Sequence, residues 1–120
     1  PFAWLMMAAG AYLACLALGM GRGAIFAGPL LATLADLVLE PAAVGPLQYW
    51  VWLGGDAIPG WIGAAPLMNS IGWLLTSLLA SSLLWASGVR KCGSREPLTV
   101  LTLHVALMAW IFVIAPLPSP

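Results

Sequence analysis

The stretch MNSIGWLLTSLLASSLLWASG, residues 68–88, carries no charged side chain and is rich in leucine. A helix of this length reaches across a bilayer, because the hydrocarbon core requires about 20 apolar residues. The stretch lies within an uncharged run over residues 57–89, and residues 1–20 form a second such run. In residues 97–120 the only side chain that can carry a charge near neutral pH is that of His104. The sequence therefore predicts a membrane protein made mainly of helices.

Composition supports the same class over the whole chain. Charged residues make up 7% of the 120 residues and the mean hydropathy is +1.02, whereas soluble domains carry about 25% charged residues. The alternating strands of a membrane barrel are absent, and a net charge of zero argues against a nucleic-acid partner. The predicted fold is all-α: an integral membrane helical bundle, a single domain over residues 1–120, in contact with the lipid bilayer.

Four transmembrane helices are predicted. Pro97 suits the first turn of the last helix, where a proline loses no helical hydrogen bond. Pro29 either kinks the second helix or lies in its first turn, and Pro41 is expected to end that helix. The predicted spans are residues 2–20, 24–40, 68–88 and 97–115.

The basic residues lie in two of the predicted loops. Because consecutive spans cross the bilayer in opposite directions, both loops fall on the same side, and the positive-inside rule makes that side cytoplasmic. The acids Asp36, Glu40 and Asp56 then lie at or near the opposite face. The four basic residues are Arg22, Arg90, Lys91 and Arg95.

Two acids on the second helix are the first candidates for function. Asp36 and Glu40 are four residues apart, so a helix places them on one face. Acids inside a membrane helix are costly and usually functional. Two nearby carboxylates in a poorly solvated site cannot both ionise cheaply, so one is expected to hold its proton near neutral pH. The alternative is that Glu40, at the end of the helix, faces headgroup water.

Residues 41–67 form a long connection rich in proline, glycine and tryptophan, with turns expected at Gly54-Gly55 and Pro59-Gly60. It either covers or re-enters the mouth of the bundle, or forms an interfacial aromatic belt. In an extended segment, Trp50 and Trp52 share a face beside Tyr49. Such rings can stabilise a cation or act as interface anchors.

A few further polar residues occur within the spans. His104 is an intramembrane candidate or a hydrogen-bonded packing residue. Asn69 is either a helix cap or a donor into a pocket. Ser77 and Ser81 have the spacing of helix packing. Cys15 and Cys92 lack the spacing of a metal site and are not expected to pair in a disulfide, so both are interpreted as structural.

Three motifs resemble one known family. They are Asp36-Leu37-Val38-Leu39-Glu40-Pro41, Tyr49-Trp50-Val51-Trp52, and the run Gly63 to Trp73 that contains Pro66, Asn69 and Gly72. In order and spacing they resemble the carotenoid biosynthesis membrane proteins that include γ-carotene 1′-hydroxylase and bisanhydrobacterioruberin hydratase. The likeness covers residues 33–73. This chain departs from the family pattern at Asp56, Trp61, Ala65 and Ser70.

The resemblance implies a cofactor-independent hydratase of a prokaryotic cell membrane. Water would add across the terminal C1′=C2′ double bond of an acyclic carotenoid substrate, and no metal or organic cofactor is implied. The candidate catalytic residues are Asp36 and Glu40, and which of them is the acid stays open. The candidate substrate-binding residues are Tyr49, Trp50, Trp52, Asn69, Trp73 and His104.

The ends of the chain favour a piece of a longer protein. Pro1 already adjoins the first span, and Pro116-Leu117-Pro118-Ser119-Pro120 follows the last. Relative to the resembled family, an N-terminal half is missing and would be a partner of these helices. Two other functions stay open: a transporter or channel fragment that uses Asp36, Glu40 and His104, and a non-catalytic membrane scaffold.

Overall fold

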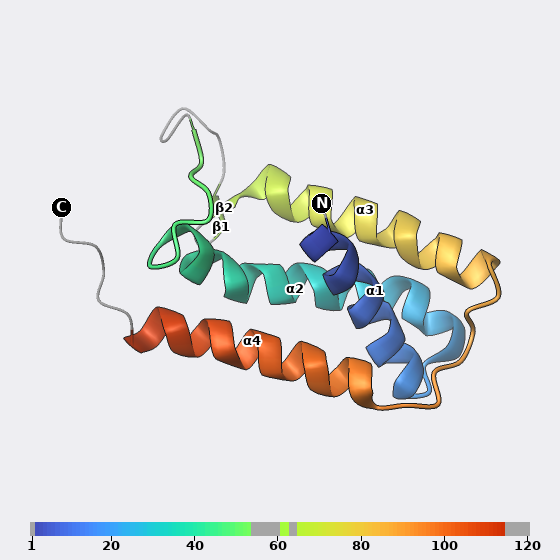
Figure 1. Ribbon diagram of the computed structural model, residues 1–120. Helices are drawn as coiled ribbons and strands as arrows, with labels where there is room; N and C mark the ends of the chain where they lie inside the picture. The colour runs from blue at the N-terminus through green and yellow to red at the C-terminus, as the bar shows by residue number, and fades with distance from the viewer. Residues whose placement is uncertain (1, 54–60, 63–64, 115–120) are drawn as a thin grey trace.

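The computed structural model describes residues 2–53, 61–62 and 65–114. Its described part contains four α-helices: α1 (Phe2–Ala17), α2 (Ala24–Val44), α3 (Leu67–Ala86) and α4 (Glu96–Ile114). A short 3₁₀ helix, η1 (Gly21–Gly23), leads directly into α2. The prediction of an all-α helical bundle is confirmed. Helices α1 and α2 each pack against the other three, with α2 running through the middle of the bundle (Figure 1).

Three stretches of the described chain are long and apolar enough to cross a membrane: Gly21–Val44, Leu67–Ala86 and Glu96–Ile114. Helix α1 is shorter, with 16 residues, or about 24 Å at 1.5 Å per residue. The helix therefore ends at Ala17, before the end of the predicted first span at about residue 20. Gly19 stops the helix because it adopts a positive φ of 79°, and the amides of Gly19 and Met20 bond back to Leu16 and Cys15, as in a Schellman cap.

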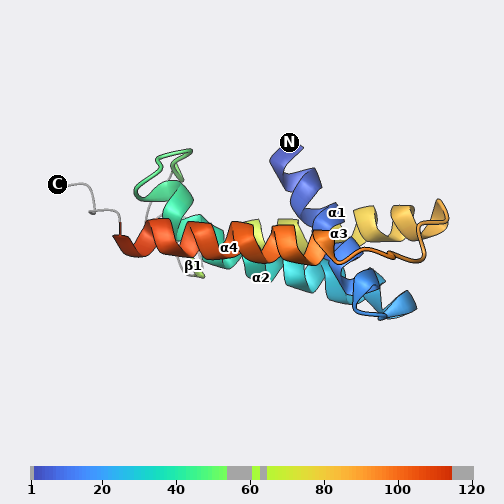
Figure 2. The same ribbon diagram turned by 60° about the horizontal axis from the view of Figure 1, so that its bottom comes forward.

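Figure 2 shows how α1 is placed against the other helices. The N-terminal end of α1 tilts out of the layer that the other three helices form. Helix α1 therefore crosses its neighbours instead of running alongside them over their full length.

Both prolines lie inside α2, which corrects the expectation that Pro41 ends the helix and leaves the kink as the alternative for Pro29. Pro29 is beyond the first turn, and the helix continues through Pro41 to Val44. Each proline removes only one helical donor, to Ile25 and to Leu37 respectively, and packing by three neighbouring helices outweighs that loss. Gly45 caps the helix, and its amide bonds to the Pro41 carbonyl at 3.1 Å. Glu40 thus lies within the helix instead of at its end, and it does not face headgroup water because it is buried.

The connection between α2 and α3 contains a small strand pair. Strands β1 (Trp61–Ile62) and β2 (Ala65–Pro66) run antiparallel, with Trp61 opposite Pro66 and Ile62 opposite Ala65. Residues 45–53 fold over the end of α2 (Figure 1). The expected turns at Gly54-Gly55 and Pro59-Gly60, and Asp56, lie outside the described residues.

Consecutive helices alternate in direction, so the connections before α2 and before α4 meet at one end of the bundle (Figure 1). This end, called the basic end from here on, holds Arg22, Arg90, Lys91 and Arg95. Arg90 lies over the ring of Trp85, 5.5 Å from its centroid. The segment 45–53 lies at the opposite end, called the acid end because α2 carries Asp36 and Glu40 toward it.

We expect the basic end to face the cytoplasm. In a protein with Cys15→Ser and Cys92→Ser, single cysteines placed at Arg22 and Lys91 should react with a membrane-impermeant thiol reagent only from the cytoplasmic side. A cysteine at Gln48, which is exposed at the acid end, should react only from the other side. Labelling of positions 22 and 91 from opposite sides would contradict the alternating arrangement.

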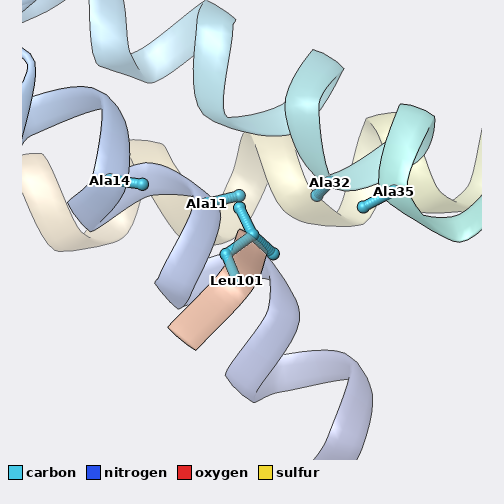
Figure 3. Close-up of a cluster of buried hydrophobic side chains, with 5 residues drawn as sticks. All are labelled: Ala11, Ala14, Ala32, Ala35 and Leu101. Atoms are coloured by element: carbon cyan, nitrogen blue, oxygen red, sulfur yellow. The ribbon is translucent and has the colours of Figure 1, made fainter. Parts of the chain in front are cut away.

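Small residues allow α1, α2 and α4 to approach closely. Ala11, Ala14, Ala32, Ala35 and Leu101 form a buried cluster where the three helices meet (Figure 3). Gly28 of α2 packs directly on the backbone of Tyr12: a Cβ at this glycine would lie 2.9 Å from the Tyr12 Cα and 3.1 Å from its N. Because the contacted atoms are backbone, no side-chain rotation can relieve the overlap.

We therefore expect Gly28→Ala to separate α1 from α2 and to destabilise the protein by about 1–3 kcal/mol, the usual cost of overpacking. Thermal unfolding in detergent or nanodiscs would measure the loss. Gly10→Ala on α1 is the matched control, since its Cβ meets no atom within 4 Å and alanine is the better helix former. Equal stability of the two variants would contradict this close approach.

Candidate functional site

The two acids of α2 lie inside the bundle. Asp36 is 3% exposed and Glu40 is 1% exposed, and they are one helical turn apart on the same face. All four basic residues lie at the other end of the molecule; Arg22, on the same helical run as Asp36, is 14 residues away, or about 21 Å along the axis. Polar neighbours, not cations, therefore surround this pair.

Glu40 is held by two tryptophans from the segment that covers the end of α2. The indole Nε1–H of Trp50 donates to Glu40 Oε1 at 2.9 Å, and that of Trp52 donates to the same oxygen at 2.7 Å. Both rings reach one carboxylate oxygen from the same short segment. Tyr49 is exposed, and its ring lies tilted against Trp50 with centroids 6.3 Å apart.

Asp36 is held from α3. The Asn69 side chain donates from Nδ2 to Asp36 Oδ2 at 2.8 Å. Asn69 does not cap the helix, because the N-cap position is Pro66; it lies in the first turn and points across to α2. This bond ties α2 to α3 at the depth of the acid pair. Among the described residues, the other Asp36 oxygen, Oδ1, accepts no hydrogen bond.

The two acids differ in what surrounds them. An indole N–H can only donate, so two of them on one oxygen match an ionised Glu40 carboxylate. Asp36 receives a single amide donor and is buried next to that carboxylate. Two adjacent buried carboxylates rarely ionise together. The arrangement can therefore provide a proton donor at Asp36 and a carboxylate at Glu40.

A shallow cavity of about 360 Å³ lies between α1 and α3, and Asn69 links it to the acid pair. The rings of Trp4 and Trp73 stand on it with centroids 6.0 Å apart and planes at 50°. Asn69 belongs both to the wall of this cavity and to the hydrogen bond that holds Asp36. The cavity is lined by Trp4, Met68, Asn69, Gly72, Trp73 and Thr76. A mostly apolar surface therefore leads to Asn69, the residue that holds Asp36.

His104 belongs to a different cavity. It lines a space of about 580 Å³ between α1 and α4, together with Glu96, Met6 and Met7. The structure thus brings Asn69 and Trp73 together at the acid-pair cavity but places His104 elsewhere. Trp4 was missed by sequence reasoning because no motif contains it and only the crossing of α1 brings it to α3. Within residues 2–53, 61–62 and 65–114, no three His, Cys, Asp or Glu side chains gather as around a metal ion.

The helices and this site define an integral membrane protein with a buried carboxylate pair beside an apolar cavity. The chain belongs to the carotenoid biosynthesis protein family, whose family model matches residues 1–118. The resemblance noted over residues 33–73 is thereby confirmed, and it extends over nearly the whole chain. No curated protein and no solved structure matches the chain.

Proposed function

We propose that this protein hydrates the terminal C1′=C2′ double bond of an acyclic carotenoid to a tertiary alcohol, in a prokaryotic cell membrane. The observation that carries the proposal is the buried Asp36–Glu40 pair, joined through Asn69 to an apolar cavity. An unactivated alkene accepts a proton only from a well-placed acid in a water-poor site. Family membership supplies the carotenoid context.

The proposed reaction balances with water as the only co-reactant. Asp36 gives its proton to C2′, and the electron pair of the double bond forms the new C–H bond, which leaves a tertiary cation at C1′. The oxygen of a water molecule bonds to C1′, and the Glu40 carboxylate takes the released proton. Transfer of that proton from Glu40 back to Asp36, one helical turn away, restores the starting state. The sum is alkene plus water giving alcohol.

The surroundings of the cavity suit such a cation. The faces of Trp4 and Trp73 can stabilise positive charge, and a carboxylate at Glu40 would add an opposite charge. The cavity volume of about 360 Å³ is at the small end of ligand pockets, which span about 300–1,000 Å³. It therefore suits the end group of a carotenoid, while the remaining polyene stays among the lipid chains.

Pigment analysis in a lycopene-producing host tests the function. Expression of the full-length gene should give a carotenoid heavier by one molecule of water. Growth in H₂¹⁸O should place the heavy oxygen in the new hydroxyl group. An unchanged pigment, or a hydroxyl whose oxygen comes from ¹⁸O₂ gas, would contradict hydration.

The transporter alternative receives less support from the geometry. That alternative requires His104 to act together with Asp36 and Glu40, whereas His104 lines the cavity between α1 and α4. The scaffold alternative is separated from hydration by the pigment experiment, because a scaffold leaves the carotenoid unchanged.

A further inference from the structure

Helix α3 directs hydroxyl groups into the bundle and leucines outward. Its buried residues are Ser70, Ser77 and Ser81, at 7%, 0% and 0% exposure. They follow the spacing i, i+7, i+11 and therefore share one helix face. None of the three Oγ atoms has a hydrogen-bond partner among the described residues. A buried hydroxyl without a partner is unusual and costs free energy.

Five other hydroxyls in or next to the helices behave differently. Thr33, Thr76 and Ser87 each donate to the carbonyl four residues earlier, and Thr99 and Thr102 do the same. A serine or threonine of a membrane helix commonly makes this bond when its hydroxyl has no other partner. The three buried serines do not adopt it, so their hydroxyls are turned toward the interior of the bundle.

A further polar group lies at the same depth. The Asn69–Asp36 bond sets the register of the antiparallel helices α3 and α2. We count residues forward along α3 from Asn69 and backward along α2 from Asp36. Ser77 then lies at the depth of Gly28–Pro29, and Ser81 lies at the depth of Ala24–Ile25. Pro29 has no N–H to donate to the Ile25 carbonyl. Two buried hydroxyls and one carbonyl without its helical donor therefore lie at similar depths on the two packed helices.

We propose that the seam between α2 and α3 holds ordered water at Ser77 and Ser81, and that this water supplies the reaction at Asp36 through Ser70. Buried water occupies sites with two or more otherwise unsatisfied polar groups. The supply role rests on the proposed hydration. A carotenoid arrives from the lipid and brings no water, and the cavity wall that receives it is largely apolar, so the reacting water needs its own polar site.

Buried side chains separate the proposed water site from the basic end. Tyr12, Leu16 and Ala24 are buried there, and Leu84 and Trp85 pack against them. The Tyr12 hydroxyl also donates to the Val89 carbonyl in the connection before α4. The water should therefore exchange slowly with bulk solvent, unlike water in an open channel.

X-ray radiolysis of the full-length protein in nanodiscs, read out by mass spectrometry, tests for this water. Radicals formed from bound water oxidise the side chains next to it. We expect oxidation in the α3 peptide that contains Ser77 and Ser81, with uptake of ¹⁸O from H₂¹⁸O that is slower than at exposed Tyr49. Ser77→Ala and Ser81→Ala should each lower this oxidation, while Ser82→Ala, on the same helix but not buried, should not. Oxidation of this peptide no higher than that of the lipid-facing α4 would overturn the inference, whether or not hydration occurs.

Product measurement tests the supply role separately. Ser77→Ala and Ser81→Ala should lower alcohol formed per inserted molecule by roughly three- to tenfold, the effect of one lost hydrogen bond. Ser77→Cys keeps the shape of the side chain, in a slightly larger form, with a poor hydrogen-bonding group, and should resemble Ser77→Ala. Normal product from all three variants, with the oxidation lost, would overturn the supply role. Bound water in a wild-type protein that forms no alcohol would support the water site and refute hydration.

Discussion

Replacing Asp36 by Asn is expected to abolish nearly all hydration while leaving the protein folded and inserted. Asparagine has almost the same shape and can still accept the Asn69 amide bond that holds Asp36 at 2.8 Å. It has no proton to give an alkene, so the rate should fall by roughly 10²–10⁴-fold, the usual contribution of a general acid. The measurement is tertiary alcohol formed per inserted molecule in the lycopene-producing host.

The control for this experiment removes another carboxylate of the same chain. Glu96 lies in the first turn of α4, exposed and away from the acid pair, and Glu96→Gln should keep normal product. Glu40→Gln should be as damaging as Asp36→Asn, because it removes the group that takes the proton from water in the proposed reaction. Near-normal product from Asp36→Asn would make the acid structural and favour the scaffold reading.

The second large effect is expected at the two tryptophans that bond to Glu40. Sequence reasoning predicts that Trp→Phe is milder than Trp→Leu, because phenylalanine keeps an aromatic face for the cation. In the structure, both indoles also donate an Nε1–H hydrogen bond to Glu40 Oε1, at 2.9 and 2.7 Å. Phenylalanine and leucine both lack this donor. A hydrogen bond to a charged group contributes about 1.5–3 kcal/mol, so Trp50→Phe or Trp52→Phe should lower product roughly 10–100-fold.

A double-mutant cycle separates the two roles. If the indoles act through the Glu40 carboxylate, Trp52→Phe should have little further effect in a Glu40→Gln background. Trp110→Phe, at a residue 61% exposed on α4, is the control and should be neutral. An equal loss in both backgrounds would show that the ring, and not its N–H, is what matters. Losses that follow only the amount of inserted protein would leave the tryptophans as interface anchors.

The helices themselves could be predicted from the sequence because their cause is local. Uncharged runs of about 20 residues must bury their backbone polar groups in helical hydrogen bonds when they enter a bilayer, and this requires no knowledge of neighbours. The placement of Asp36 and Glu40 on one face follows from helical geometry in the same way. The motifs over residues 33–73 were sufficient to indicate the family.

The helix ends could not be predicted as well because they depend on competing effects. Pro41 disfavours helix locally, yet α2 continues to Val44, since tertiary packing outweighs one missing donor. Conversely, α1 ends at Ala17 although apolar residues continue, because Gly19 closes a cap at a positive φ. Neither outcome follows from hydropathy, because hydropathy contains no information on packing or on backbone conformation.

The partners of the acids were decided by the tertiary structure alone. Sequence reasoning could place Asp36, Glu40, Trp50, Trp52 and Asn69 near one end of the bundle, but not pair them. The bonds to Glu40 span 10 and 12 residues and that to Asp36 spans 33, so they depend on how residues 45–53 fold back and how α3 is set against α2. The same packing sends His104 to another cavity and brings Trp4 beside Trp73. Periodicity tells which way a side chain points from its own helix, whereas the contact it makes depends on the crossing of two helices.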